Sequence, residues 1–350
     1  MDSGSSKIKN PKQDCLGLVR MDSESSNLNH NLASGELKVK CLGLEQGELL
    51  KQFIFYLKDY LQKKIWLLCV NDNGEIGIFQ GLKRGSKRYS VYLEKRFKKL
   101  NNSLKKEIKI NGNKTNSIFL TLTIAENSVD SVLKGVQRFK PYLDKVRKDL
   151  KKLGFGFKFF WVREFQKRGS LHYHLIIVLG KSFHFRKDKT GKTFILSQKL
   201  YNKLFNIFNQ WGLGFVSLEP VSSFGEIKRY LAKYIIKGLS EIETEIENFE
   251  IENFNPENLT ENFIKRVYAY AYALIFKFRL FGSSRWKLDI IYTYNNSVKG
   301  WGIARGFKLI KTFKNWFKLV DFVLKNWGIV LNEPPPSGEL VLVLLKNSKN

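Results

Sequence analysis

The chain is poor in cysteine and histidine, and it has no long apolar run. Its three cysteines among 350 residues are odd in number and not paired in spacing, which excludes a disulfide framework and a cysteine-based zinc site. A reducing compartment fits this usage. No apolar stretch approaches the length of a membrane span, so we expect no membrane partner.

Acidic residues are outnumbered almost two to one. Lys and Arg total 60 against 32 Asp and Glu, and the resulting net charge of +28 suits a polyanion such as nucleic acid. Aromatic residues make up 14% of the chain and would offer stacking platforms for single-stranded bases. A lysine-rich soluble protein from an AT-rich genome would explain part of the same excess. We expect the protein in the cytoplasm, or in the DNA-containing compartment of a host or organelle.

Two of the four histidines lie in one tripeptide. His172 and His174 open an apolar run, rich in β-branched residues, that predicts a strand. Alternation along a strand points both imidazoles to the same face, where neighbouring imidazoles form a natural pair of metal ligands. The alternative for such a tripeptide, taken alone, is a pair of packed or solvated side chains.

A carboxylate is predicted beside these histidines by the preceding turn. Residues 157–166 also read as a strand, and residues 167–169 form the connection. If this is a three-residue loop with Gly169 in the left-handed conformation, the register places Glu164 directly opposite His172. Two histidines and a carboxylate favour Mg²⁺ or Mn²⁺ with open coordination positions. The alternative is an exposed Glu164 that pairs with a neighbouring basic residue.

Two tyrosines four residues apart lie in a predicted helix over residues 224–238. Tyr230 and Tyr234 share one helix face, and Lys233 and Lys237 repeat the same spacing beside it. A tyrosine hydroxyl is a poor nucleophile at its usual pKa near 10, but adjacent ammonium groups or a metal-polarised phosphate would activate it. Core packing of both rings is the alternative.

These three motifs together carry a family resemblance. The strand at 119–123, the histidines at 171–174 and the tyrosines at 230–234 stand in the order of the motifs of HUH endonucleases. The chain most resembles the two-tyrosine rolling-circle replication initiators of small single-stranded DNA phages and plasmids. The resemblance covers residues 117–239, roughly a third of the chain.

The resemblance implies a nickase of single-stranded origin DNA. Its metal, Mg²⁺ or Mn²⁺, would be held by His172, His174 and Glu164, although family members differ in the third ligand. A tyrosine would become joined to a DNA 5′ phosphate, leaving a 3′ hydroxyl for rolling-circle replication, and we expect Tyr230 and Tyr234 to alternate. A non-catalytic single-strand binder and an HUH transposase or relaxase remain as alternatives.

Two further partners follow from a missing motif. Residues 191–193 end like a phosphate-binding loop, but the required earlier glycine position holds Arg186, so we find no ATPase signature. Unwinding of duplex DNA would therefore come from a host helicase, and synthesis from a host DNA polymerase.

The predicted fold class is α+β, with a central antiparallel sheet covered on one face by helices and the metal site on the other face. Composition divides the chain into six regions. These are a largely disordered segment (1–50), a basic accessory lobe (51–115), the endonuclease domain (116–240), an acidic flexible linker or flap (241–261), a helical C-terminal region (262–330) and a tail (331–350).

Basic residues outside the central motifs are candidates for DNA contacts. Residues 51–114 carry 16 Lys and Arg against five Asp and Glu, and residues 278–286 mix basic with aromatic side chains. From these stretches and the predicted hairpin turn, the candidates are Lys83, Arg84, Lys87, Arg88, Arg168, Arg279 and Arg285.

Overall fold

The computed structural model describes residues 44–191, 193–252, 254–284, 307–327, 331 and 342–344, without the side chains of 235–237 and 342–344. Nearly all of the segment predicted to be disordered, and the candidate Arg285, lie outside these residues. No helix in the described part of the chain is both long and apolar enough to cross a membrane.

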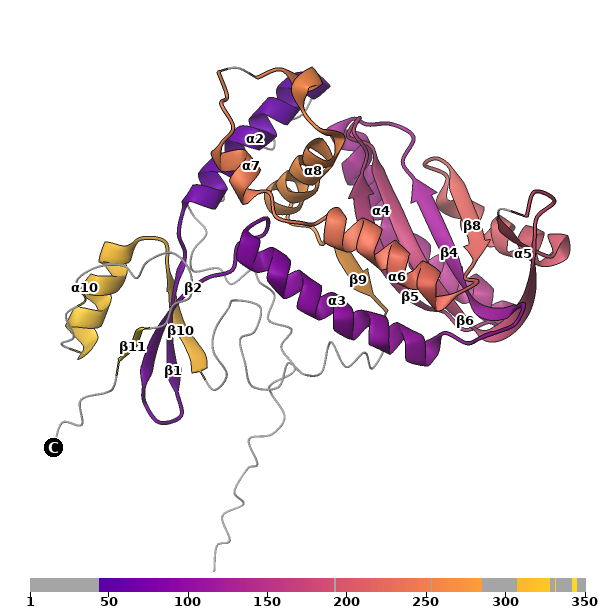
Figure 1. Cartoon of the computed structure of the whole chain (residues 1–350), viewed down its shortest axis with the longest axis horizontal. Coiled ribbons are helices and arrows are strands. Elements are labelled where there is room, and N and C mark those ends of the chain that lie inside the picture. The colour runs from indigo at the N-terminus through magenta and orange to yellow at the C-terminus, as the bar shows by residue number, and fades with distance from the viewer. Residues whose placement is uncertain are drawn as a thin grey trace, which may run out of the picture.

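A seven-stranded antiparallel sheet organises the chain and confirms the predicted α+β class (Figure 1). Its centre is β4, β6 and β5, in that order. Short strands extend it on both sides, and β7 pairs with the far end of β6. The strands are β3 (Ile110–Asn111), β4 (Lys114–Thr123), β5 (Lys158–Phe165), β6 (Leu171–Lys187), β7 (Phe194–Leu196), β8 (Val216–Pro220) and β9 (Phe281–Ser283).

One face of the sheet is wholly apolar and packs on α4 (Val129–Lys152), α5 (Gln198–Phe208) and the turn η2 (Asn209–Trp211). Alternation along β6 turns Tyr173 to this face, and its ring stacks on Phe139 of α4 at 3.9 Å between centroids. The same alternation turns the residues on either side of Tyr173, which are the two histidines, to the opposite face.

The opposite face is also covered by helices, which differs from the prediction of a single covered face. The helices there are α6 (Phe224–Leu231), its continuation η3 (Ala232–Lys237) and α3 (Lys87–Glu107), and Figure 1 shows α3 and α6 running side by side. Helix α8 (Glu261–Ile275) packs between β5 and α2 (Gln46–Gln62). Because α8 is apolar around nearly its whole circumference, it needs burial on all sides.

A second, four-stranded sheet joins segments that are far apart in sequence. Its order is β10 (Phe307–Phe313), β1 (Trp66–Asn71), β2 (Ile76–Gln80) and β11 (Leu342–Leu344), and helix α10 (Trp316–Trp327) packs on it. The rings of Trp66 and Trp316 meet at 4.9 Å. The region predicted to be helical therefore also supplies strands to both sheets, since β9 joins the large one.

Two predicted regions look different once packed. Helices α2 and α3 bury their apolar sides in the same core as the large sheet, so only the β1–β2 hairpin of the predicted basic lobe lies outside that core. The acidic segment carries α7 (Glu243–Glu247) instead of forming a flexible linker. Ile242 and Ile246, four residues apart, are fully buried, and Arg266 pairs with Glu245.

Candidate functional site

The hairpin between β5 and β6 brings a carboxylate to the histidines as predicted. Gly169 has φ +83°, the left-handed conformation of a three-residue loop, and Gln166 N–H donates to Ser170 O. The resulting register places Glu164 directly opposite His172. Because this turn has an odd number of residues, Glu164 lies on the same face as both imidazoles.

Glu164 contacts His174 directly. The distance from Glu164 Oε2 to His174 Nε2 is 2.7 Å, and Lys265 Nζ of α8 lies 3.6 Å from Glu164 Oε1. Burial raises the pKa of Glu164, but the hydrogen bond from His174 and the charges of Lys265 and Lys233 outweigh it, so the pKa falls below its usual value. Glu164 is therefore a carboxylate at neutral pH.

Each histidine is oriented through its Nδ1 atom by a polar neighbour. Thr121 Oγ1 lies 3.3 Å from His174 Nδ1, and the Gln166 side-chain amide lies 3.4 Å from His172 Nδ1. His172 Nε2 is buried and has no hydrogen-bond partner. A fixed Nδ1 and an available Nε2 are the usual arrangement of a histidine that binds a metal through Nε2.

Both imidazoles are neutral at physiological pH. Burial lowers the pKa of His172 to about 4, and the charge of a protonated His174 would lower it further. Burial also lowers the pKa of His174, and this effect exceeds the opposing effect of Glu164. Neutral imidazoles keep the nitrogen lone pairs that a metal ion requires.

The donor set fits a divalent ion, although the side chains stand in a hydrogen-bonded arrangement. Among the residues that the structure describes, no three His, Cys, Asp or Glu side chains are placed to hold an ion as they stand. The 2.7 Å contact between Glu164 and His174 explains this, because two ligands of an ion bound at about 2.1 Å lie about 3 Å apart. An ion would replace that hydrogen bond and use the orphaned His172 Nε2.

Both predicted tyrosines lie against the histidines. The Tyr234 ring stacks on His174 at 3.7 Å between centroids, and Tyr230 meets the same imidazole edge-on at 5.9 Å. Tyr230 also stacks on Phe119 of β4, and its hydroxyl is buried without a hydrogen-bond partner. Burial raises the pKa of Tyr230 well above 10, and the nearby carboxylates of Glu164 and Glu219 add to the shift.

The tyrosine helix changes its geometry between the two rings. Helix α6 ends at Leu231, and residues 232–237 continue as a π-helix, a feature that is frequent at functional sites. Lys233 Nζ lies 3.2 Å from Tyr234 Oη, so this lysine serves its sequence neighbour and not Tyr230 as the spacing suggested. A Cβ on Gly238 would lie 2.7 Å from Tyr234 O, so the close of this helix requires glycine. The Lys237 side chain lies outside the described residues.

Lys265 is a site residue that sequence reasoning missed. It lies on α8, about ninety residues after the histidines in sequence, and its ammonium bridges Glu164 and Glu261. The available signal was its i,i+4 spacing from Glu261, which marks a helical ion pair but not its target on another element.

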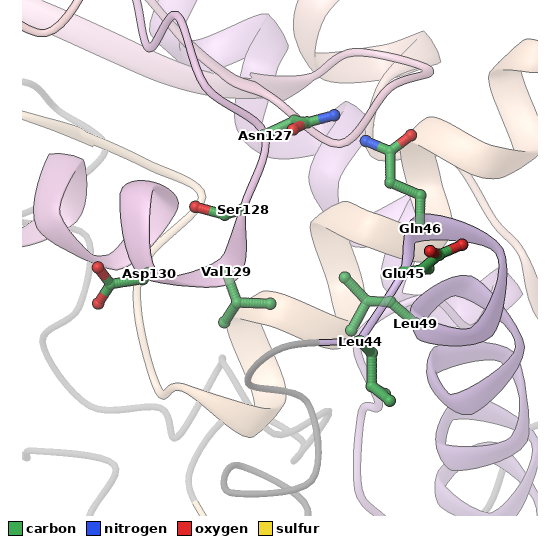
Figure 2. Close-up of a pocket in the computed structure, with 8 residues that line it drawn as sticks. All are labelled: Leu44, Glu45, Gln46, Leu49, Asn127, Ser128, Val129 and Asp130. Atoms are coloured by element: carbon green, nitrogen blue, oxygen red, sulfur yellow. The ribbon is translucent and has the colours of Figure 1, made fainter.

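A groove of about 440 Å³ borders the tyrosines. It runs along β4 and β8 under α6, and its lining combines aromatic, acidic and basic side chains. A second hollow of about 580 Å³ lies where α2 and α4 begin, with Leu49 and Val129 facing each other and the amides of Gln46 and Asn127 at one rim (Figure 2). Glu45 and Asp130 line this second hollow, and their charges disfavour a nucleic-acid phosphate.

The predicted DNA contacts divide by exposure. Lys87, Arg168 and Arg279 are exposed, which is compatible with phosphate contacts. Arg84 and Arg88 are half-buried, and each donates to a backbone carbonyl. Lys83 corrects the prediction, because it is only 6% exposed and its ammonium donates to Tyr60 O and Leu61 O at the end of α2. Carbonyls at a helix C-terminus lack intrahelical partners, which explains this placement of a cation.

The buried Lys83 predicts a pH dependence of stability. Burial lowers its pKa to about 8 from 10.5, so the folded state binds this proton less tightly than the unfolded state. Its contribution to the free energy of unfolding is therefore greatest above pH 10.5 and is lost as the pH falls through 8. In urea titrations between pH 8 and 9.5, we expect Lys83→Met to remove this rise. Lys87→Met, at an exposed position, should keep it; an unchanged slope in Lys83→Met would contradict the account.

Comparison with known proteins agrees with this geometry. Residues 117–239, roughly a third of the chain, match the family model of the ORF2-type replication-associated protein. The matched stretch contains the histidines, Glu164 and both tyrosines. The match supports a role in the initiation of DNA replication and, with it, binding of DNA. No curated protein and no solved structure matches the chain.

Proposed function

We propose that the protein nicks single-stranded DNA at a replication origin and joins itself to the new 5′ end through a tyrosine. The observation that carries this proposal is the packing of both Tyr230 and Tyr234 on His174, which itself bonds Glu164. A pair of candidate nucleophiles and a candidate metal-binding set then meet on one imidazole.

The metal would be Mg²⁺ or Mn²⁺, held by His172, His174 and Glu164. When bound, it would polarise the scissile phosphate and stabilise the charge that develops there. Thr121 and Gln166 hold the two imidazoles through Nδ1, so that both Nε2 atoms keep one orientation.

The tyrosines would perform a transesterification. The phenolic oxygen forms a bond to phosphorus, the bond from phosphorus to the 3′ oxygen breaks, and the phenolic proton is balanced by protonation of the leaving 3′ oxygen. Lys233 favours the phenolate of Tyr234 by its charge at 3.2 Å. Burial opposes ionisation of Tyr230, so its hydroxyl depends on the phosphate environment for activation.

Two tyrosines on one imidazole suit a repeated reaction. After one round of rolling-circle synthesis, the first tyrosine still holds the old 5′ end, and the second can cleave the regenerated origin. The released 3′ hydroxyl then resolves the first phosphotyrosyl bond, and the roles exchange. A host helicase and a DNA polymerase would supply unwinding and synthesis.

The test is a search for a covalent product. The protein is incubated with a library of single-stranded oligonucleotides of random sequence and Mn²⁺, denatured, and separated by electrophoresis. We expect labelled DNA that migrates with the protein and depends on the metal. Binding of DNA without any covalent product would favour a non-catalytic single-strand binder and overturn the proposal.

A further inference from the structure

The groove beside the tyrosines has the size and lining of a site for one nucleotide. Phe119, Phe194 and Tyr230 contribute aromatic surface, on which a base can stack. Arg229 and Lys233, four residues apart on the tyrosine helix, place two exposed cations at the same groove, where they suit backbone phosphates.

Two carboxylates also line this groove, and they differ in availability. Glu226 is occupied, because its two oxygens accept hydrogen bonds from the backbone and the hydroxyl of Ser222 at the start of α6. Glu219 of β8 is exposed, and within the described part of the chain no group forms a hydrogen bond or ion pair with its carboxylate. Both oxygens of Glu219 are therefore open to a ligand.

An open carboxylate is unexpected in a groove that would hold DNA. It repels phosphates, and the strongly basic chain otherwise favours them. A carboxylate becomes favourable where it accepts hydrogen bonds from a base edge. The Watson–Crick edge of guanine carries two adjacent donors, N1–H and the N2 amino group, and a carboxylate can accept both at once. No other DNA base offers two adjacent donors on that edge.

We propose that this groove binds a guanine next to the scissile phosphate and that Glu219 determines this specificity. The inference rests on the proposed nicking function, since it places the guanine beside the tyrosine nucleophiles. The rings of Phe119 and Phe194 would stack on the base, and Arg229 would contact a flanking phosphate. Single-stranded DNA is required, because the Watson–Crick edge is paired in a duplex.

The experiment separates recognition from chemistry. A Tyr230→Phe/Tyr234→Phe protein, which keeps both rings, is used to select ligands from the random single-stranded library. We expect dG enrichment at one position. Replacing that dG by deoxyinosine, which lacks only the N2 amino group, should weaken binding about fivefold or more in fluorescence anisotropy. Adding Glu219→Gln should abolish this difference, whereas adding Glu226→Gln should retain it.

Two results would overturn the inference: no dG enrichment, or a dG preference that Glu219→Gln leaves unchanged. Covalent products of the wild-type protein on the same library are scored separately. Adducts without a dependence on Glu219 would leave the nicking proposal standing and remove only this inference. A Glu219-dependent dG preference without any adduct would retain the recognition site and overturn the nicking.

Discussion

Replacing both Tyr230 and Tyr234 by phenylalanine is expected to reduce the covalent DNA adduct by about a thousandfold or more, because no nucleophile remains beside His174. Phenylalanine keeps the ring contacts with Phe119 and His174, so the fold and the binding of single-stranded DNA should persist. Each single variant should still form some adduct but fail to release circles, since the roles can no longer exchange. Gel analysis of adducts and of circular products measures both effects.

A matched control is Tyr201→Phe on α5, a half-buried tyrosine that stacks on Phe205 and packs on the other face of the sheet. It should leave both products unchanged. If Tyr234→Phe completed full rounds at the wild-type rate, Tyr234 would be a packing residue and the alternating mechanism would be wrong.

Removal of the histidine pair is expected to abolish specific binding of Mn²⁺. In His172→Ala/His174→Ala, one carboxylate remains of the three donors, and the stabilisation that metal gives the folded state should disappear. The wild-type melting temperature should rise with Mn²⁺ concentration, whereas that of the double variant should not. The electron paramagnetic resonance signal of free Mn²⁺ gives an independent measure of binding. Adduct formation should fall with metal binding.

Two further variants separate metal binding from folding. Tyr230→Phe should bind Mn²⁺ like the wild type, because it removes no donor. Thr121→Val removes the hydroxyl beside His174 Nδ1 and should weaken Mn²⁺ binding about 10-fold or more. A melting temperature that still rises with Mn²⁺ in the double histidine variant would place the metal elsewhere.

Local rules were sufficient to predict the centre of the site. The position of Gly169 fixed the hairpin loop, and strand alternation then placed Glu164 with the two histidines. The four-residue spacing of Tyr230 and Tyr234 correctly predicted a shared face, because the helix continues through both. These features depend on residues close together in sequence.

Features that depend on distant contacts were not predictable in the same way. The π-helix changes the partner of Lys233, and no local pattern of residues 224–238 indicated it. The many glutamates of the acidic segment concealed the buried pair Ile242 and Ile246. Lys83 belongs to a basic run but caps a helix that ends some twenty residues earlier.

The packing of α2 and α3 also changes what a truncation can show. A deletion of residues 1–110 would isolate a DNA-binding lobe if the basic region were separate. It would instead remove both helices from the main core, including fully buried residues such as Phe53 and Leu104. We therefore expect loss of folding, and point substitutions are the appropriate test of DNA contacts.

The most direct test of the proposed chemistry is to identify the modified residue. Trypsin cuts after Arg229, Lys233 and Lys237, so it separates the two tyrosines into the peptides 230–233 and 234–237, which differ in mass. After reaction with single-stranded DNA and Mn²⁺, digestion with nuclease and trypsin leaves a nucleotide remnant on any modified peptide. Mass spectrometry should find this remnant on one or both peptides, through the tyrosine oxygen. Cleaved DNA with both peptides unmodified would contradict the account.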